Sequence, residues 1–301
     1  MAPTDTTTAD SRRDIHAEVT QTIIDALERG VVPWRSPILG RGAAGHPTNL
    51  DSGRPYAGVN VFLLALNAWS AGFTSRYWLT FKQALARGGA VRKGEKSTLV
   101  VFWKLYETKD RQTGEATTVP VLKHYRVFNA EQCDGITTPE VATFEPTEFA
   151  PIERAQAIVA GYAGGPALSH GGAKAFYRPS TDEVRLPEPT RFTSIEEYYS
   201  TLFHELAHST GHSSRLDRKL DTELRPFGSA DYAKEELVAE MASAFLSADA
   251  GIRPAVIENQ AAYIGGWLKS LRDDKRLVVA AAGAAQKAAD WIRGTRPRAD
   301  A

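Results

Sequence analysis

The sequence predicts an α+β protein built of two domains, and three observations support this. Its 301 residues exceed the usual length of one domain. Residues 98–106 and 117–129 alternate with the period of two that is typical of strands, whereas apolar residues elsewhere recur at helical spacing. A segment with Pro139 and Pro146 then separates the strands from a helix-rich second half. The predicted division is a disordered N-terminus at 1–13, a first domain at 14–136, a linker at 137–150, a second domain at 151–293 and a tail at 294–301.

The first domain begins with helices. Apolar residues recur at helical spacing over 15–27, and Gly30 ends this helix. Residues 31–49 are rich in proline and glycine and predict a loop, while residues 59–71 predict a second helix. Thr80 and Gln83 form a capping box for a short third helix. The two strands follow as a hairpin, with residues 107–116 as its loop.

The second domain is mostly helical. Residues 152–163 predict a helix and residues 175–186 a short hairpin. Ser194 and Glu197 form a capping box for a helix that ends near Gly211. Further helices are expected over 232–240 and 277–292, with a core stripe of Tyr263, Trp267 and Leu271 between them.

Composition and charge exclude several classes of protein. Hydrophobic residues make up 43% of the chain, and no apolar run is long enough to cross a membrane or to act as a secretory signal. The single cysteine, Cys133, cannot form an internal disulfide and is expected to be inert, which favours the cytoplasm. Residues 1–136 carry 17 basic and 13 acidic side chains, although the whole chain has a net charge of zero.

The most basic segment runs from Arg76 to Lys96, where aromatic side chains are interleaved with cations. Cations that follow phosphates and aromatic faces that stack on bases are typical of sites for single strands. The alternative for this segment is a solvated turn beside aromatic residues that are buried in the core. Trp34 in the earlier loop also has two interpretations, since it could either fill a small core or stack on a base. The candidate DNA contacts are Trp34, Arg76, Tyr77, Trp78, Lys82, Arg92, Lys93 and Lys96.

The strongest chemical signal is the pattern His204-Glu205-x-x-His208. Residues four apart on a helix point the same way, so the two histidines can bind one metal ion. Glu205 projects about 100° around the helix from His204, which places it to take a proton from a water at the metal. This is the arrangement of zincin peptidases, and it makes Glu205 the candidate catalytic base.

A catalytic site of this type needs a third protein ligand. The helix over 232–240 offers Glu236 and Glu240, which share a face, so we expect Glu236 to bind the metal and Glu240 to hold a histidine N–H from behind. Glu235 remains an alternative ligand. Ser214 occupies the position of a metzincin's third histidine, and His212 is expected to lie outside the ligand set.

Histidine with carboxylate ligation suits Zn²⁺ first, although Mn²⁺ or another divalent ion would compete. The expected chemistry is peptide hydrolysis, with Glu205 moving the proton from water to the leaving amine. Tyr177, His170 or His212 could steady the oxyanion, and their spacing does not choose among them.

Motifs along both halves resemble the ArdC antirestriction family of plasmids and other mobile elements. In the first half they look like that family's single-stranded-DNA-binding domain, and they lie at residues 32–34, 47–49, 56–60, 78–83, 91–96 and 125–129. In the second half they look like its zincin-type metallopeptidase domain, and they lie at residues 198–211, 215–216, 235–240 and 262–264.

The resemblance implies a protein that binds single-stranded DNA and protects incoming mobile-element DNA from restriction, with an unknown protein substrate. Two alternatives stay open: a single-strand-binding shield whose metal site is only structural, and a cytosolic metallopeptidase with no role on DNA. Glu205 favours a peptidase over the shield, because a structural site needs no general base.

Overall fold

The computed structural model describes residues 14–34, 46–109, 115–139, 150–219, 230–252 and 260–295. Helices and strands are both present, so the α+β class is confirmed. The helices are α1 (Ile15–Glu28), α2 (Val59–Ala71), α3 (Phe81–Ala86), α4 (Ala150–Ala160), α5 (Ile195–Ser209), α6 (Ala230–Ala250), α7 (Gln260–Asp273) and α8 (Leu277–Ile292). The strands are β1 (Thr48–Asn49), β2 (Tyr77–Thr80), β3 (Ala90–Val91), β4 (Thr98–Lys109), β5 (Ala116–Asn129), β6 (Cys133–Asp134), β7 (Ala167–His170), β8 (Phe176–Arg178) and β9 (Glu183–Leu186).

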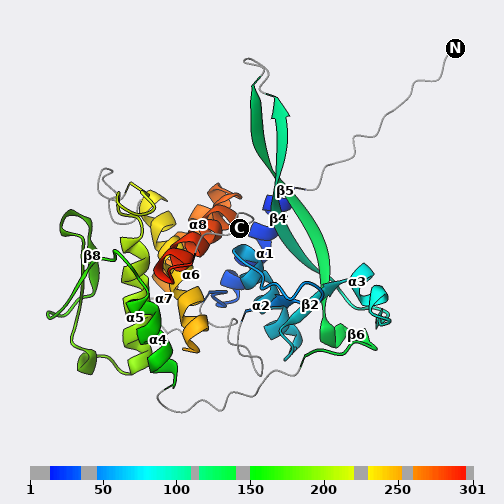
Figure 1. Ribbon diagram of the computed structural model, residues 1–301, viewed down its shortest axis with the longest axis horizontal. Helices are drawn as coiled ribbons and strands as arrows, with labels where there is room; N and C mark the ends of the chain where they lie inside the picture. Colours follow the sequence, from blue (N-terminus) through cyan, green and yellow to red (C-terminus); the bar gives the residue numbers. More distant parts are fainter. Residues whose placement is uncertain are drawn as a thin grey trace.

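A four-stranded sheet organises the first half, with strand order β1-β2-β5-β4. Strands β4 and β5 pair antiparallel from Thr98 opposite Val127 to Lys109 opposite Ala116, and this long hairpin projects from the body of the molecule (Figure 1). Strand β2 was not predicted. It pairs with β5 on one side and β1 on the other, which makes it an interior strand of the sheet.

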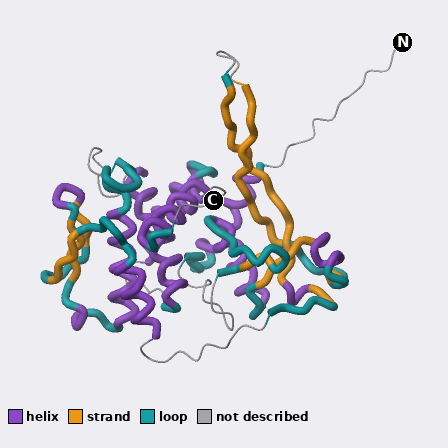
Figure 2. Tube along the Cα trace, in the orientation of Figure 1, coloured by secondary structure: helices purple, strands orange, loops and turns teal. Residues whose placement is uncertain are grey.

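The helices of both halves share one hydrophobic core. Val19 and Ile23 of α1 and Phe62 of α2 are fully buried in the same cluster as Phe245 of α6 and Val278 of α8. The rings of Phe62 and Phe245 stack with centroids 4.9 Å apart. In Figure 2 the helices of this core lie together, and the β4–β5 strands rise away from them. The first half is therefore held against the second by apolar packing.

Two elements of the second half position the candidate site. Helix α5 packs against α6, and a three-stranded sheet of order β7-β9-β8 lies beside α5 (Figure 1). Strands β8 and β9 form the predicted hairpin, with Phe176 opposite Arg185, while β7, which runs parallel to β9, was not predicted. At the start of α5, the hydroxyl of Ser194 accepts a hydrogen bond from the Glu197 backbone N–H at 3.1 Å, which is one half of the predicted capping box. The Glu197 carboxylate accepts instead from the Thr193 backbone N–H at 2.8 Å, so the other half does not form.

Some predicted element bounds and core residues are confirmed, and other predictions fall outside the described residues. Helices α2 and α8 have the predicted bounds, and the hairpin strands extend further into the predicted loop than expected. Trp267 and Leu271 are buried in the core, while the Tyr263 side chain lies outside the described residues. The predicted disordered start at 1–13, most of the linker and most of the tail also lie outside them. Cys133 is a buried thiol, and burial raises its pKa.

Candidate metal centre

Helix α5 presents its two histidines to α6. One face of α5 is apolar, and buried Leu202, Phe203 and Leu206 fix its rotation against the core. His204 and His208 lie one turn apart on the side that faces α6, and their Nε2 atoms are 3.0 Å apart. The helical spacing of the motif therefore produces the expected pair.

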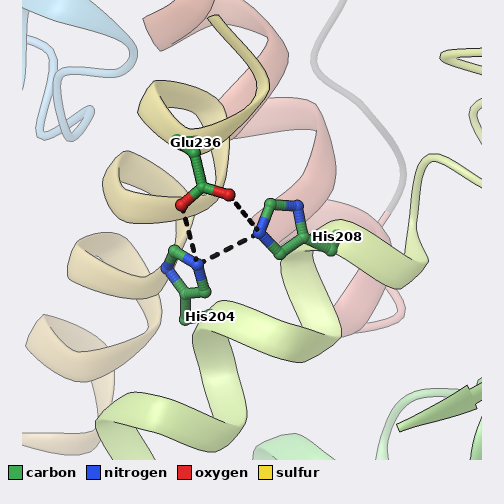
Figure 3. Close-up of side chains that lie close together, drawn as sticks. All are labelled: His204, His208 and Glu236. Carbon is green, nitrogen blue, oxygen red and sulfur yellow. Dashed lines mark hydrogen bonds and ion pairs between the residues drawn. The ribbon is translucent and has the colours of Figure 1, made fainter. Parts of the chain in front are cut away.

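Glu236 of α6 completes a cluster of three donor groups (Figure 3). Its Oε2 atom lies 3.5 Å from Nε2 of His204, and its Oε1 atom lies 3.5 Å from Nε2 of His208. Within the described residues, this is the group of histidine, cysteine and acidic side chains that could hold a metal ion.

These separations fit a small divalent cation. Ligands about 2.0–2.2 Å from a tetrahedral ion lie about 3.3–3.6 Å from one another. Two of the three separations, at 3.5 Å, fall in that range, and the third, at 3.0 Å, is slightly shorter. Two imidazoles and a carboxylate are also a donor set that suits zinc and neighbouring transition metals. The three side chains could therefore hold one divalent ion.

Glu235 has a different environment from Glu236. Its Oε1 atom lies 3.3 Å from Nδ1 of His208, on the side of the ring away from the cluster. Arg218 donates to both oxygens of Glu235, from Nη2 to Oε1 at 2.7 Å and from Nε to Oε2 at 3.0 Å. With both oxygens engaged, Glu235 is suited to orient His208, and Glu236 is the carboxylate that faces the metal position.

Arg218 is in turn fixed to the end of α5. Its guanidinium donates to the hydroxyl of Thr210 at 2.7 Å and to the carbonyl of Ala207 at 2.9 Å. Arg218 is not predicted from the sequence, because its partner Glu235 lies on the next helix, α6, and no local spacing marks the pair. The nearest signal is the pair Arg215 and Arg218 shortly after the metal motif.

Glu240 lies behind the other histidine. Its Oε1 atom is 3.7 Å from Nδ1 of His204, and its side chain is 7% exposed. This is the position expected for a carboxylate that orients the ring, although the distance exceeds that of a hydrogen bond. Each histidine therefore has one acidic residue in front of it and another behind it.

The buried histidines and glutamates of the cluster shift one another's pKa values toward their charged forms. Burial opposes protonation of His208, but its hydrogen bonds to Glu235 and Glu236 outweigh burial and raise its pKa to about 10. Burial also opposes ionisation of Glu235, but its bonds with His208 and Arg218 lower its pKa to about 2. The carboxylates thus stay negative and favour positive charge between them.

Glu205 follows His204 on α5, and its side chain is 9% exposed. The candidates for an oxyanion donor all have partners. The Tyr177 hydroxyl donates to Asp182, His170 faces the Tyr198 hydroxyl, and His212 faces Ser214. The structure does not single out one of the three.

The aromatic candidates for DNA contact are buried, which corrects that part of the prediction. Trp34 is fully buried and packs edge-on against Phe62 and Trp267, with ring centroids 6.1 and 5.1 Å away. Tyr77 and Trp78 are 7% and 1% exposed, because β2 is an interior strand with packing on both faces. No base could stack on these rings in this structure.

The basic candidates divide into two groups. Lys82, Lys93 and Lys96 are exposed. Arg76 lies over the Tyr77 ring at 5.2 Å, and Arg92 pairs with Glu95 at 3.0 Å, so these two also have structural roles. Exposed aromatic side chains that the sequence analysis did not select lie instead on the β4–β5 hairpin, namely Phe102, Trp103, Tyr106 and Tyr125.

Two protein families match the chain, one in each half. The N-terminal domain of the anti-restriction factor ArdC matches residues 13–128, and the zincin-like metallopeptidase family matches residues 153–284. No helix among the described residues is long and apolar enough to span a bilayer.

Individual relatives match almost the whole chain. The protein y4eC of Sinorhizobium fredii is 40% identical over 93% of this chain and 91% of its own length. A DNA primase TraC of Escherichia coli is 40% identical over 94% of this chain, which spans only 27% of that longer protein.

Two solved structures are also similar. Crystal structures of the antirestriction ArdC protein from plasmid R388 match 93% of this chain and 97% of theirs. The metal-free form has a TM-score of 0.74 at 38% identity, and the Mn(II)-bound form has 0.75 at 36%. With both halves matched in one continuous alignment, this chain belongs to the ArdC antirestriction family.

Proposed function

We propose that this protein is an antirestriction protein that binds single-stranded DNA and hydrolyses peptide bonds at its metal centre, so protecting incoming mobile-element DNA in the cytoplasm. The observation that carries the peptidase part is a three-ligand site with Glu205 beside it on α5. The Mn(II)-bound relative supports a divalent ion, and we propose Zn²⁺ as the native metal with Mn²⁺ as a substitute.

His204, His208 and Glu236 would hold the ion, while Glu235 and Glu240 keep the imidazole rings oriented. When bound, a divalent ion lowers the pKa of a water molecule and polarises a scissile carbonyl. Glu205 accepts the proton of the attacking water and delivers it to the leaving amine. The protein substrate is a peptide segment of a partner that this site does not identify.

The peptidase test compares Glu205→Gln with Glu196→Gln, an exposed glutamate on the same helix. Both variants are loaded with Zn²⁺ or Mn²⁺, and cleavage of fluorescein-labelled casein is measured. We expect Glu205→Gln to lose at least 100-fold in rate with metal affinity retained, and Glu196→Gln to match wild type. Equal cleavage by Glu205→Gln and wild type would remove the proposed base.

For DNA binding, we propose residues 14–136 as the principal surface and Lys82, Lys93 and Lys96 as phosphate contacts. Full-length protein should bind a labelled oligothymidylate more tightly than a duplex, with affinity that falls as salt rises. Changing the three lysines to Gln should flatten the salt dependence by about 0.7 per lost contact. Lys174→Gln with Lys269→Gln, two exposed lysines in the second half, is the control.

The same measurements separate the alternatives. Strand binding without Glu205-dependent cleavage would favour a shield whose metal site is structural. Cleavage without strand binding would favour a metallopeptidase that has no role on DNA.

A further inference from the structure

A cavity of about 700 Å³ lies where the first half of the chain meets α8. Its walls come from the turn after β1, the segment that leads into α2, the edge of β4 and one face of α8. The lining includes Arg54, Tyr56, Asn60, Phe102, Trp103 and Gly283. A volume of this size is typical of small-molecule sites and exceeds what one nucleobase needs.

Aromatic rings form one side of the cavity. Tyr56 and Phe102 supply these rings, and Phe102 is 37% exposed, although a side chain of its size is usually buried. The side chain of Trp103, the next residue of β4, points to the opposite face of the strand, where its ring lies 6.2 Å from that of His16. The Phe102 ring lies 6.2 Å from the Tyr56 ring and 5.6 Å from the Tyr125 ring. These two neighbours hold the Phe102 ring in place, while part of it remains exposed to solvent. An exposed aromatic ring that its neighbours hold in place is a surface on which a flat base can stack.

The polar groups of the lining have no negative charge. Among the described lining residues, Arg54 is the charged one, and the others with polar side chains are asparagine, serine, glutamine and tyrosine. Beyond the cavity, Lys104 and Lys123 lie exposed on the hairpin, with their ammonium groups 5.2 and 5.4 Å from the Tyr106 ring. This charge pattern complements a phosphate chain that enters the cavity from the hairpin.

The edge of β4 offers hydrogen bonds inside the cavity. The Asn60 side chain exchanges two of them with the Val101 backbone, at 2.7 and 2.8 Å, so the N–H and C=O of Val101 point away from β5. Strand geometry repeats every two residues, and the backbone groups of Trp103 therefore point the same way. No bond to them is seen among the described residues. One N–H beside one C=O can pair with the donor and acceptor on the edge of a base.

We propose that this cavity receives an unstacked base of single-stranded DNA, stacked on Phe102, with the flanking phosphates on Arg54 and the hairpin lysines. The inference rests on the proposed strand binding and gives it a location. Because α8 forms the opposite wall, the strand contacts both halves of the chain at once.

Gly283 on α8 allows a direct test. A Cβ atom built there meets no atom within 4 Å, so a larger side chain can enter the cavity without a clash at its root. Gly266 on α7 is equally open but does not line the cavity, which makes the same substitution there a matched control. Gly283→Ala is a second control, because it adds one methyl group and leaves most of the volume.

The experiment measures anisotropy of a labelled 15-nucleotide oligothymidylate with full-length wild type, Gly283→Phe, Gly266→Phe and Gly283→Ala, after circular dichroism confirms folding. We expect Gly283→Phe to bind at least tenfold more weakly and both controls to bind within twofold of wild type. A strand with 2-aminopurine should change its fluorescence on wild type and not on Gly283→Phe.

If wild type and Gly283→Phe bind the strand equally, the cavity is not a base site, while strand binding as such stands. If wild type itself does not bind, both the inference and the DNA part of the proposed function fail. An equal loss in Gly283→Phe and Gly266→Phe would also overturn the inference, because the effect would not come from filling the cavity.

Discussion

Arg218 holds Glu235 by two hydrogen bonds, at 2.7 and 3.0 Å, and is itself fixed to the C-terminal end of α5. The pair joins the helix that carries the histidines to the helix that carries the carboxylates. His208 is thereby supported by a residue that does not face the metal position.

Arg218→Ala should weaken metal binding by about 10–100-fold, because Glu235 would lose the partner that keeps it against His208. Calorimetric titration with Zn²⁺ and with Mn²⁺ measures this, and Arg218→Lys should recover only part of the affinity, since one ammonium cannot replace two guanidinium bonds. Arg178→Ala, an exposed arginine of β8, serves as the control. Unchanged affinity in Arg218→Ala would show that His208 needs no such support.

Glu236→Gln and Glu235→Gln should differ in the size of their effects. Glu236→Gln removes the charged donor that faces both Nε2 atoms, so we expect a loss of more than about 100-fold in metal affinity. Glu235→Gln should lose less, about 10-fold, since it alters only the support of His208. The reverse order in the same titration would make Glu235 the third ligand.

Asp182→Asn should give a stability defect that depends on pH. Hydrogen bonds from Arg215, whose side chain is 3% exposed, lower the pKa of Asp182 below its ordinary value of 3.8. A lowered carboxyl pKa stabilises the fold above 3.8, and this contribution disappears as pH falls from 3.8 through the folded pKa.

The defect should be about 2 kcal/mol at pH 7, below the range for a fully buried pair because Asp182 is partly exposed, and should shrink below pH 4. Urea unfolding of Asp182→Asn and Asp273→Asn at pH 7 and at pH 3.5 measures it. The exposed Asp273 should show no defect at either pH, and a constant defect in Asp182→Asn would rule out the charge as its source.

Trp34→Ala should destabilise the fold by about 4 kcal/mol, because a fully buried indole between Phe62 and Trp267 is removed. Trp69→Ala, at a 52% exposed position of α2, should change stability by less than about 0.5 kcal/mol. Denaturant unfolding gives both values. If Trp34→Ala binds single-stranded DNA more weakly but is as stable as wild type, the prediction is wrong and Trp34 contacts DNA.

Local patterns were sufficient where a feature depends on near neighbours. The Nε2 atoms of His204 and His208 lie 3.0 Å apart because the two residues are four apart on one helix, and the capping residue Ser194 is close to the helix start that it fixes. Helix α8 has the predicted bounds because its apolar and alanine-rich run is continuous.

Features that depend on distant partners were missed or misread. Tyr77 is buried because β2 pairs with β5, some fifty residues later in the chain, and nothing within β2 indicates that pairing. The sequence does not decide whether Trp34 lies in the core or at the surface, since its packing partner Trp267 lies far along the chain in α7. Glu236 was expected as the ligand from its spacing, but the contacts of Glu235 with Arg218 and His208 could not be predicted, since they depend on the folded chain.

The shared core has a consequence for synthesis. Helix α1 is synthesised before α2 to α6, yet it packs against α7 and α8, which follow them in the chain, and Thr20 donates a hydrogen bond to the Lys275 carbonyl at 2.7 Å. The apolar face of α1 that contacts α7 and α8 therefore stays uncovered while the helices between them are made. This part of the core closes only once α8 has emerged from the ribosome.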